Sequence, residues 1–150
     1  MASTNRVFLL TAGLLGLAAL SGCKKKDASP IGADSSAVVT APAFRVQTID
    51  LGKSIMADKR VANGSDTFAR TDTIYASVVT EGSAPSKTIV ARWTFQDGQV
   101  VKEETLTISP IGTAATEFHI MKPTGWPVGK YKVEILVDGA SVGTKDFEVK

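Results

Sequence analysis

The sequence has very little of the residue types on which disulfides, metal sites and acid–base catalysis usually depend. Its 150 residues include one cysteine and one histidine. A single cysteine excludes an intrachain disulfide and a cysteine-rich metal site, and a single histidine excludes most histidine-based metal sites. A strong excess of one charge is also missing, because 17 Lys and Arg residues oppose 15 Asp and Glu residues. The chain therefore lacks the electrostatic footprint of a protein that binds nucleic acid.

Motifs typical of several enzyme classes are missing as well. There is no Gly-x-Ser-x-Gly elbow and no glycine-rich phosphate loop leading into a helix. Glu103 and Glu104 are adjacent in a predicted strand, so they point to opposite faces and cannot act together as a glycosidase pair. Asp66 and Asp72 lack the dense acidic spacing of a calcium loop. We therefore expect a protein that is not an enzyme and that holds no metal or other cofactor.

The longest apolar run lies near the amino end and is too short for a comfortable transmembrane helix. It extends from Val7 to Leu20, broken only by Thr11 and two glycines. A helix over this run spans about 21 Å, whereas the apolar core of a bilayer is roughly 30 Å thick. Arg6 precedes the run and small residues follow it. This order predicts a secretory signal.

The residues that follow the apolar run carry a more specific signal. Leu20-Ser21-Gly22-Cys23 resembles the lipobox of bacterial lipoproteins, and Cys23 is the chain's only cysteine. The resemblance implies that a signal peptide, residues 1–22, is cleaved between Gly22 and Cys23. It also implies that the Cys23 thiol receives a diacylglycerol and that the new amino group is acylated. Several acyl chains, at ~0.8 kcal/mol per buried CH₂, would hold a soluble domain on a membrane. The alternative is a free thiol after an ordinary signal peptide.

The residue after Cys23 bears on the destination of the protein. It is Lys24 rather than aspartate, which by resemblance to the sorting rules of enteric bacteria favours the outer membrane. The three lysines 24–26 could each add ~1 kcal/mol of attraction to anionic lipid. We therefore expect a lipid-anchored protein of the bacterial cell envelope, at the outer membrane and facing the periplasm.

A tether and one domain follow the expected anchor. Residues 23–43 comprise the lipidated cysteine and a segment rich in Ala, Ser, Pro and Gly, with no sustained period. Fully extended, the part after the lysines reaches about 50 Å. Residues 44–150 change character, because β-branched and aromatic residues appear in short runs between turn signals. We assign this second part to a folded domain.

The folded part shows the period-two alternation of half-buried strands. Asp97-Gly98 and Asp138-Gly139 each separate two such runs and predict hairpin turns, while Asn63-Gly64 marks a small hairpin or loop in the least regular segment, 53–69. No window shows a convincing helical stripe. The pattern predicts about seven strands, over residues 44–51, 72–80, 87–96, 99–108, 113–121, 130–138 and 141–149.

Seven strands with this spacing predict an all-β, antiparallel sandwich or small barrel. Trp93 falls on the inward face of the third strand, where immunoglobulin-like domains often bury a tryptophan. Tyr131 opens the sixth strand two residues before inward-facing Val133, which resembles a tyrosine corner. Together these residues favour a sandwich similar to immunoglobulin-like and fibronectin type III-like domains.

Few side chains are candidates for a site. Trp126 lies between a glycine and a proline in a loop, where it could anchor a partner or a sugar ring, or plug the open end of the sandwich. We favour the plug. Tyr75 is a second aromatic that could stack on a ligand. His119 should face solvent beside Glu117, which offers it a contact but no nucleophile.

These observations lead to three hypotheses. The first is a non-catalytic interaction domain held on the membrane by lipid, with a protein of the cell envelope as its partner. The second is a carbohydrate- or peptidoglycan-binding module, which requires that Trp126 and Tyr75 are exposed on one surface. The third is an enzyme with an unrecognised site, which requires a deep polar pocket around His119.

Overall fold

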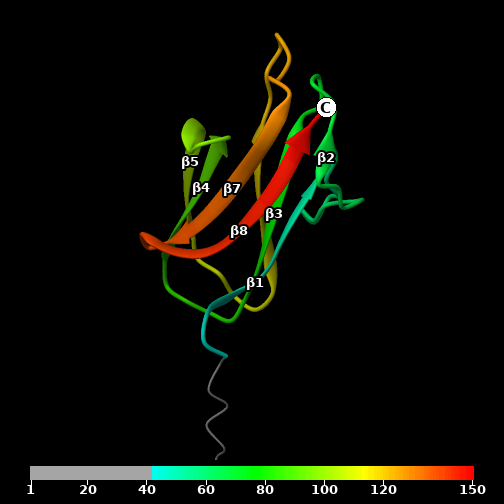
Figure 1. The fold of residues 1–150 in the computed structure, drawn as a ribbon. Coiled ribbons are helices and arrows are strands. Elements are labelled where there is room, and N and C mark those ends of the chain that lie inside the picture. Colours follow the sequence, from blue (N-terminus) through cyan, green and yellow to red (C-terminus); the bar gives the residue numbers. More distant parts are fainter. Residues whose placement is uncertain (1–41) are drawn as a thin grey trace, which may run out of the picture. The chain divides into compact units, whose positions relative to one another are not determined.

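The alternating segments form eight strands in the computed structural model, which describes residues 42–150 (Figure 1). The predicted signal peptide, Cys23 and the tether before residue 42 lie outside the described residues. No helix in the described part of the chain has the length and hydropathy needed to cross a membrane. The strands are β1 (Arg45–Gly52), β2 (Thr67–Phe68), β3 (Ile74–Glu81), β4 (Lys87–Phe95), β5 (Gln99–Ile108), β6 (Ala114–Ile120), β7 (Gly129–Val137) and β8 (Ala140–Val149).

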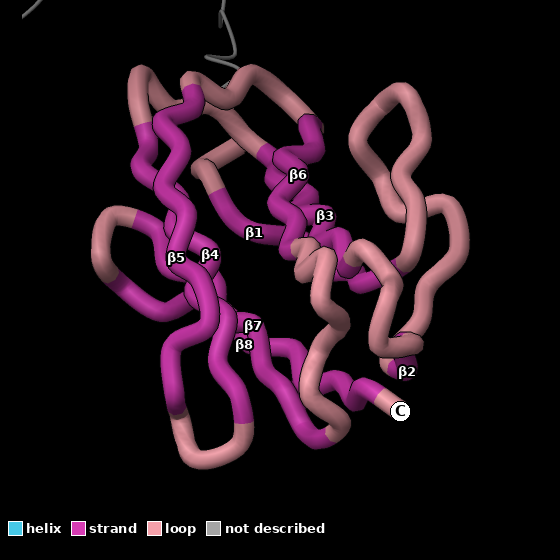
Figure 2. Tube along the Cα trace, turned by 90° about the horizontal axis from the view of Figure 1, so that it is seen from above, coloured by secondary structure: helices cyan, strands magenta, loops and turns pink. Residues whose placement is uncertain are grey.

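The strands make two sheets that face each other, as Figure 2 shows. One sheet has the order β1-β3-β6 and the other the order β2-β8-β7-β4-β5. All pairings are antiparallel except that of the short β2 with β8. Of the seven long strands, β1, β3 and β6 form one sheet, and β5 pairs with β4 in the other sheet. This is the arrangement of an immunoglobulin-like sandwich of the fibronectin type III-like kind.

The core lies between the two inner faces. Alternate residues of each strand point inward because successive side chains leave a strand on opposite sides. Trp93 of β4 and Phe118 of β6 come from opposite sheets and are both fully buried. Trp93 is therefore a core residue, as its position in the alternating pattern predicted. Other fully buried apolar residues are Phe68, Ile74, Ala76, Val78, Ile89, Ala91, Val133, Ile135 and Val149.

The two predicted hairpins are present. β7 and β8 are joined through Asp138 and Gly139, whose φ angles are 49° and 84°. Two consecutive positive φ angles match the right-handed twist of the flanking strands, and Asp-Gly accommodates them. Gly98, with φ 97°, lies in the turn between β4 and β5.

The strand boundaries agree with the prediction to within two residues, and β3 shows why the ends differ. The prediction began this strand at residue 72, but the structure begins it at Ile74. The Asp72 side chain accepts a hydrogen bond from the Ala69 amide (2.8 Å), and the Asp72 amide donates to the Ala69 carbonyl (3.0 Å). These bonds keep Asp72 in a turn.

The irregular segment before β3 holds the main element that the sequence did not predict. Ile55 and Val61 form an antiparallel bridge, so a small hairpin turns between them rather than at Asn63-Gly64, where Gly64 instead pairs with Gly52. β2 then pairs in parallel with the end of β8 and buries Phe68, which is 1% exposed. A strand of two residues is too short for apolar and polar residues to alternate, so no sequence pattern predicts it.

Candidate functional site

The end of the sandwich where β7 begins is organised by Tyr131. Its ring is 3% exposed, and its hydroxyl donates a hydrogen bond to the Pro127 carbonyl oxygen at 2.8 Å. This bond ties the start of the strand to the loop before it and confirms the predicted tyrosine corner. Burial raises the pKa of Tyr131 above 10.0, because the charged form loses hydration.

Trp126 closes the same end of the sandwich. Its ring is 4% exposed, and its indole N–H donates to the Asp72 carbonyl oxygen at 3.1 Å. The Trp126 amide donates to the Arg70 carbonyl at 2.8 Å, and the Arg70 Nε donates back to the Trp126 carbonyl at 3.1 Å. These contacts hold the ring in place as a plug, as we favoured from the sequence. Trp126 is only 4% exposed, so the structure does not present it as an exposed aromatic on which a ligand could stack.

Tyr75 and His119 lie near the same end of the domain, where β3 begins and β6 ends, but on the outside of the sandwich. Each sits next to a core residue on its own strand, so both face outward from the three-stranded sheet. They are paired across β3 and β6, with ring centroids 5.5 Å apart. His119 is exposed, and its Nδ1 lies 2.8 Å from Glu117 Oε1. The structure therefore does not bring Tyr75 and Trp126 onto one surface, as the stacking hypothesis requires.

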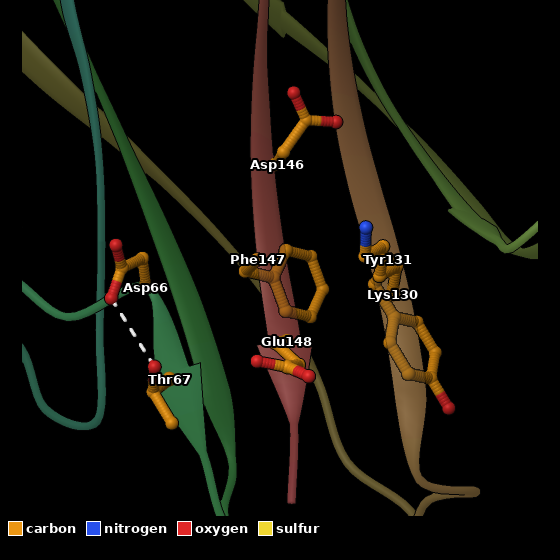
Figure 3. A pocket seen from close by; sticks show the side chains of 7 residues that line it. All are labelled: Asp66, Thr67, Lys130, Tyr131, Asp146, Phe147 and Glu148. Carbon is orange, nitrogen blue, oxygen red and sulfur yellow. Dashed lines mark hydrogen bonds between the residues drawn. The ribbon is translucent and has the colours of Figure 1, made fainter.

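A hollow over β7 and β8 is lined by several charged side chains. It measures about 480 Å³. Figure 3 shows that the carboxylates of Asp66, Asp146 and Glu148 point to different sides and do not converge. No group of three or more His, Cys, Asp or Glu residues within 42–150 could hold a metal ion. This hollow therefore does not gather catalytic or metal-ligating side chains at one point.

A second surface is lined mainly by apolar and aromatic side chains, and sequence reasoning missed it. It consists of two adjoining hollows of about 260 and 220 Å³, between the start of β5 and the loop from β6 to β7. We call the two hollows together the apolar groove. Both are lined by Val101, Lys122 and Trp126. The remaining lining residues are Phe95, Gln99, Val100, Lys102, Ile120, Met121, Pro127 and Tyr131.

The floor of the apolar groove is rigid. The Tyr131 ring lies 4.7 Å from that of Phe95 and 6.1 Å from that of Trp126, measured between centroids. Aromatic pairs at these distances attract each other beyond simple burial. The hydrogen bonds of Tyr131 and Trp126 fix the same rings. The groove is therefore built on side chains that packing already holds.

An irregularity in β5 turns two valines toward this groove. Trp93 pairs with Lys102 and Thr94 pairs with Val100, so Val101 is an extra residue without a partner on β4. In a regular strand, adjacent side chains point to opposite faces. A bulge changes the direction of a side chain locally, and here Val100 and Val101 both line the larger hollow. Two adjacent valines in the strand predicted over residues 99–108 were the available sequence signal.

The charge around the apolar groove has one sign. Its charged lining residues are Lys102 and Lys122, and no acidic residue lines either hollow. The Lys102 ammonium group is 2.8 Å from Glu104 and donates to the His119 carbonyl at 2.9 Å. Lys122 forms no ion pair within residues 42–150. The groove is therefore apolar at its floor and positive at its rim.

Comparisons with known proteins add little to this description. No family model matches the sequence, and no curated protein matches it. An immunoglobulin-like protein of Pseudomonas aeruginosa is similar in structure, at 12% identity and a TM-score of 0.48 over 73% of this chain and 98% of that one. A CARDB domain of Pyrococcus furiosus, solved with di-metal ions, has 16% identity and a TM-score of 0.45 over 73% and 90% of the two chains.

A DNA glycosylase of Pseudomonas fluorescens, bound to DNA with an abasic-site analogue, is also similar, at 17% identity and a TM-score of 0.47. The match covers 71% of this chain and only 30% of the glycosylase. Likeness at these levels carries no statement about ligands. The immunoglobulin-like assignment rests on the strand order and the tyrosine corner described above.

Proposed function

We propose that this protein is a lipid-anchored component of the bacterial cell envelope whose sandwich domain binds another protein and catalyses no reaction. The anchor is argued from the sequence, where Cys23 ends a lipobox-like motif after an apolar run. The binding role is argued from the apolar groove. Clustered exposed apolar side chains rimmed by polar residues are typical of protein–protein interaction sites.

The position of the apolar groove suits a tethered domain. The described chain enters at Pro42, whose carbonyl accepts a hydrogen bond from the Ser83 amide just before β4. The groove includes Phe95, at the other end of that strand. β4 has nine residues, so the two ends lie roughly 26 Å apart at ~3.3 Å per residue. Figure 1 shows β1 and the β4–β5 turn at opposite ends of the sandwich.

This geometry supports a specific mechanism. The described chain begins at one end of the sandwich and the candidate binding surface lies at the other, so the expected tether and a partner need not compete for the same surface. Confinement to a membrane raises the effective concentration of the domain near such a partner. We place the protein at the outer membrane, facing the periplasm, because Lys24 follows the cysteine.

Two alternatives lose their main support. The module that binds carbohydrate or peptidoglycan required Trp126 and Tyr75 on one exposed surface, and Trp126 is buried. The enzyme required a deep polar pocket around His119, and no hollow described for residues 42–150 is lined by His119. The protein-binding role is the one that an observed surface favours.

Membrane fractionation of the native chain and of Cys23→Ala tests the anchor. Wild type should sediment with membranes, and the mass of its amino-terminal fragment should include the acyl groups on Cys23. Correctly exported Cys23→Ala should be released into the soluble fraction. If that variant sediments with membranes as wild type does, the anchor assignment is wrong.

A further inference from the structure

We infer that the apolar groove binds an extended segment of a protein partner through apolar side chains flanked by an acidic group. This inference rests on the proposed function, because it names the surface and the chemistry of the partner. Three of the seven large apolar side chains exposed among the described residues line the groove. They are Val100, Val101 and Met121, which are 55%, 37% and 64% exposed.

The size of the apolar groove indicates what it can hold. Its hollows measure about 260 and 220 Å³, and both are smaller than a typical pocket for a small molecule, which begins near ~300 Å³. They adjoin along Val101 and Trp126. Two connected hollows of this size suit successive side chains of a peptide better than one compact cofactor.

The bulge at Val101 indicates how the partner binds. β5 is an edge strand, and edge strands can accept another strand through their free backbone groups. A bulge interrupts that pairing pattern and twists the edge away from a new strand. At this bulge the two valine side chains turn toward the groove. Binding through inserted side chains is therefore favoured over addition of a strand to β5.

The positive charge at the rim of the groove favours a partner whose apolar side chains are flanked by an acidic group. Lys122 has no ion-pair partner within residues 42–150, so it is the cation available to a ligand, whereas Lys102 already contacts Glu104. A second copy of this chain is a poor occupant. An isologous contact places the same patch on both sides of the interface, which would bring like-charged lysines together. A partner with a carboxylate beside its apolar side chains complements the rim instead.

A sugar is disfavoured by the same geometry. Recognition of a sugar by stacking needs an open aromatic face, but the Trp126 and Tyr131 rings are 4% and 3% exposed. These two rings form part of the floor of the groove, but they do not expose an aromatic face on which a sugar could stack. Soluble peptidoglycan fragments are therefore a competing probe in the test, and we expect them not to bind at the groove.

The test uses the full-length lipidated chain in detergent micelles and three series of synthetic peptides. One series has apolar residues flanked by Asp or Glu, one has the same apolar residues flanked by Lys, and one has polar residues flanked by Asp or Glu. Affinity is measured by peptide anisotropy and by the change in tryptophan emission on binding; Trp93 also emits, but only Trp126 of the two tryptophans lines the hollows. Soluble peptidoglycan fragments serve as the fourth probe.

Two variants change the groove, and each has a matched control on β8. Val101→Asp is compared with Val142→Asp, because Val142 is a similarly exposed valine (44%) in the same sheet, in the part of β8 that β2 does not pair with. Lys122→Glu is compared with Lys145→Glu, because both lysines are exposed. Thermal unfolding shows that each variant is folded before its affinity is compared with wild type.

We expect wild type to prefer the apolar–acidic series over both other series. Val101→Asp should weaken that binding by about tenfold or more, and Lys122→Glu should shift the preference toward the basic flank. The two β8 controls should bind as wild type does. The inference is overturned if wild type binds none of the peptides, if Val101→Asp and Val142→Asp behave alike, if the flanking charge has no effect, or if peptidoglycan fragments bind more tightly than the peptides.

Failure here is distinguishable from failure of the proposed function. If the groove variants still capture a protein partner in cells as wild type does, the domain binds through another surface and only this inference is wrong. If Cys23→Ala stays on the membrane, the anchor assignment is wrong whatever the peptides show.

Discussion

Gly82 and Gly98 offer a matched test of how the chain enters the sandwich. Both have a φ angle of +97°, a conformation that residues with a side chain rarely adopt. A Cβ added at Gly98 meets nothing within 4 Å, whereas a Cβ added at Gly82 lies 2.5 Å from the carbonyl oxygens of Pro42 and Ala43. Substitution by alanine therefore strains the backbone at both positions, but it causes a steric clash only at Gly82.

The expected costs follow from these two environments. A left-handed conformation costs an ordinary residue roughly 1–2 kcal/mol, and alanine recovers ~0.4–1 kcal/mol by restricting the unfolded chain. Gly98→Ala should therefore destabilise the fold by about 1 kcal/mol. Gly82→Ala should also displace Pro42 and Ala43 and break the Ser83–Pro42 hydrogen bond of 3.3 Å. We expect a further ~1–2 kcal/mol from the lost bond and the displaced backbone.

Urea unfolding of both variants measures the difference. The midpoint of Gly82→Ala should fall well below that of Gly98→Ala, with the same slope, because a change of midpoint at constant slope reports stability alone. Equal losses for the two variants would refute the reasoning, because they would mean that residues 42 and 43 are not packed against Gly82.

Four further predictions concern individual side chains. Tyr131→Phe keeps the ring but loses the hydroxyl bond to Pro127, so it should cost about 1 kcal/mol in urea unfolding; a loss near zero would contradict the corner. Burial raises the Tyr131 pKa. Wild type should therefore lose stability as pH rises from about 10, where the unfolded chain ionises, up to the higher pKa of the folded state. Tyr131→Phe has no hydroxyl to ionise and should not show this loss. The pKa of Asp72 is lowered from 3.8, mainly by the hydrogen bond from Lys53 and next by that from the Ala69 amide. The Asp72 carboxylate therefore contributes stability that is lost as pH falls through its folded-state pKa. Asp72→Asn should accordingly narrow the difference in Tm between neutral and acid pH. Trp93 and Trp126 are 0% and 4% exposed, so acrylamide should quench native emission several-fold less than emission in urea, and equal quenching in the two states would contradict the plug.

The sequence was sufficient to predict the seven long strands because each carries its own periodic signal. In a strand with one buried face, apolar and polar residues alternate whichever strands lie beside it. The alternate residues Ile89, Ala91 and Trp93 are therefore enough to predict β4. The two Asp-Gly turns are local in the same way. The tyrosine corner was also predictable, because its hydroxyl and its acceptor are only four residues apart in the chain.

The apolar groove was not predictable, because it depends on contacts between distant segments. Val101 is an extra residue only relative to the register of β5 on β4, which pairs Trp93 with Lys102. Met121 and Lys122 reach the same surface through the loop that the tyrosine corner holds. Similarly, β2 exists only because the end of β8 is available to pair with it. Alternation describes one strand at a time and carries no information about register.

The most direct test of the account is chemical crosslinking in intact cells, followed by purification of the tagged chain and identification of what is attached. Wild type is compared with exported Cys23→Ala, because we propose that lipid tethering brings the domain to its partner. We predict that one envelope protein is enriched with wild type and lost with Cys23→Ala. Recovery of peptidoglycan fragments, of no partner, or of the same protein at the same level with Cys23→Ala would contradict recruitment by a tethered binding domain.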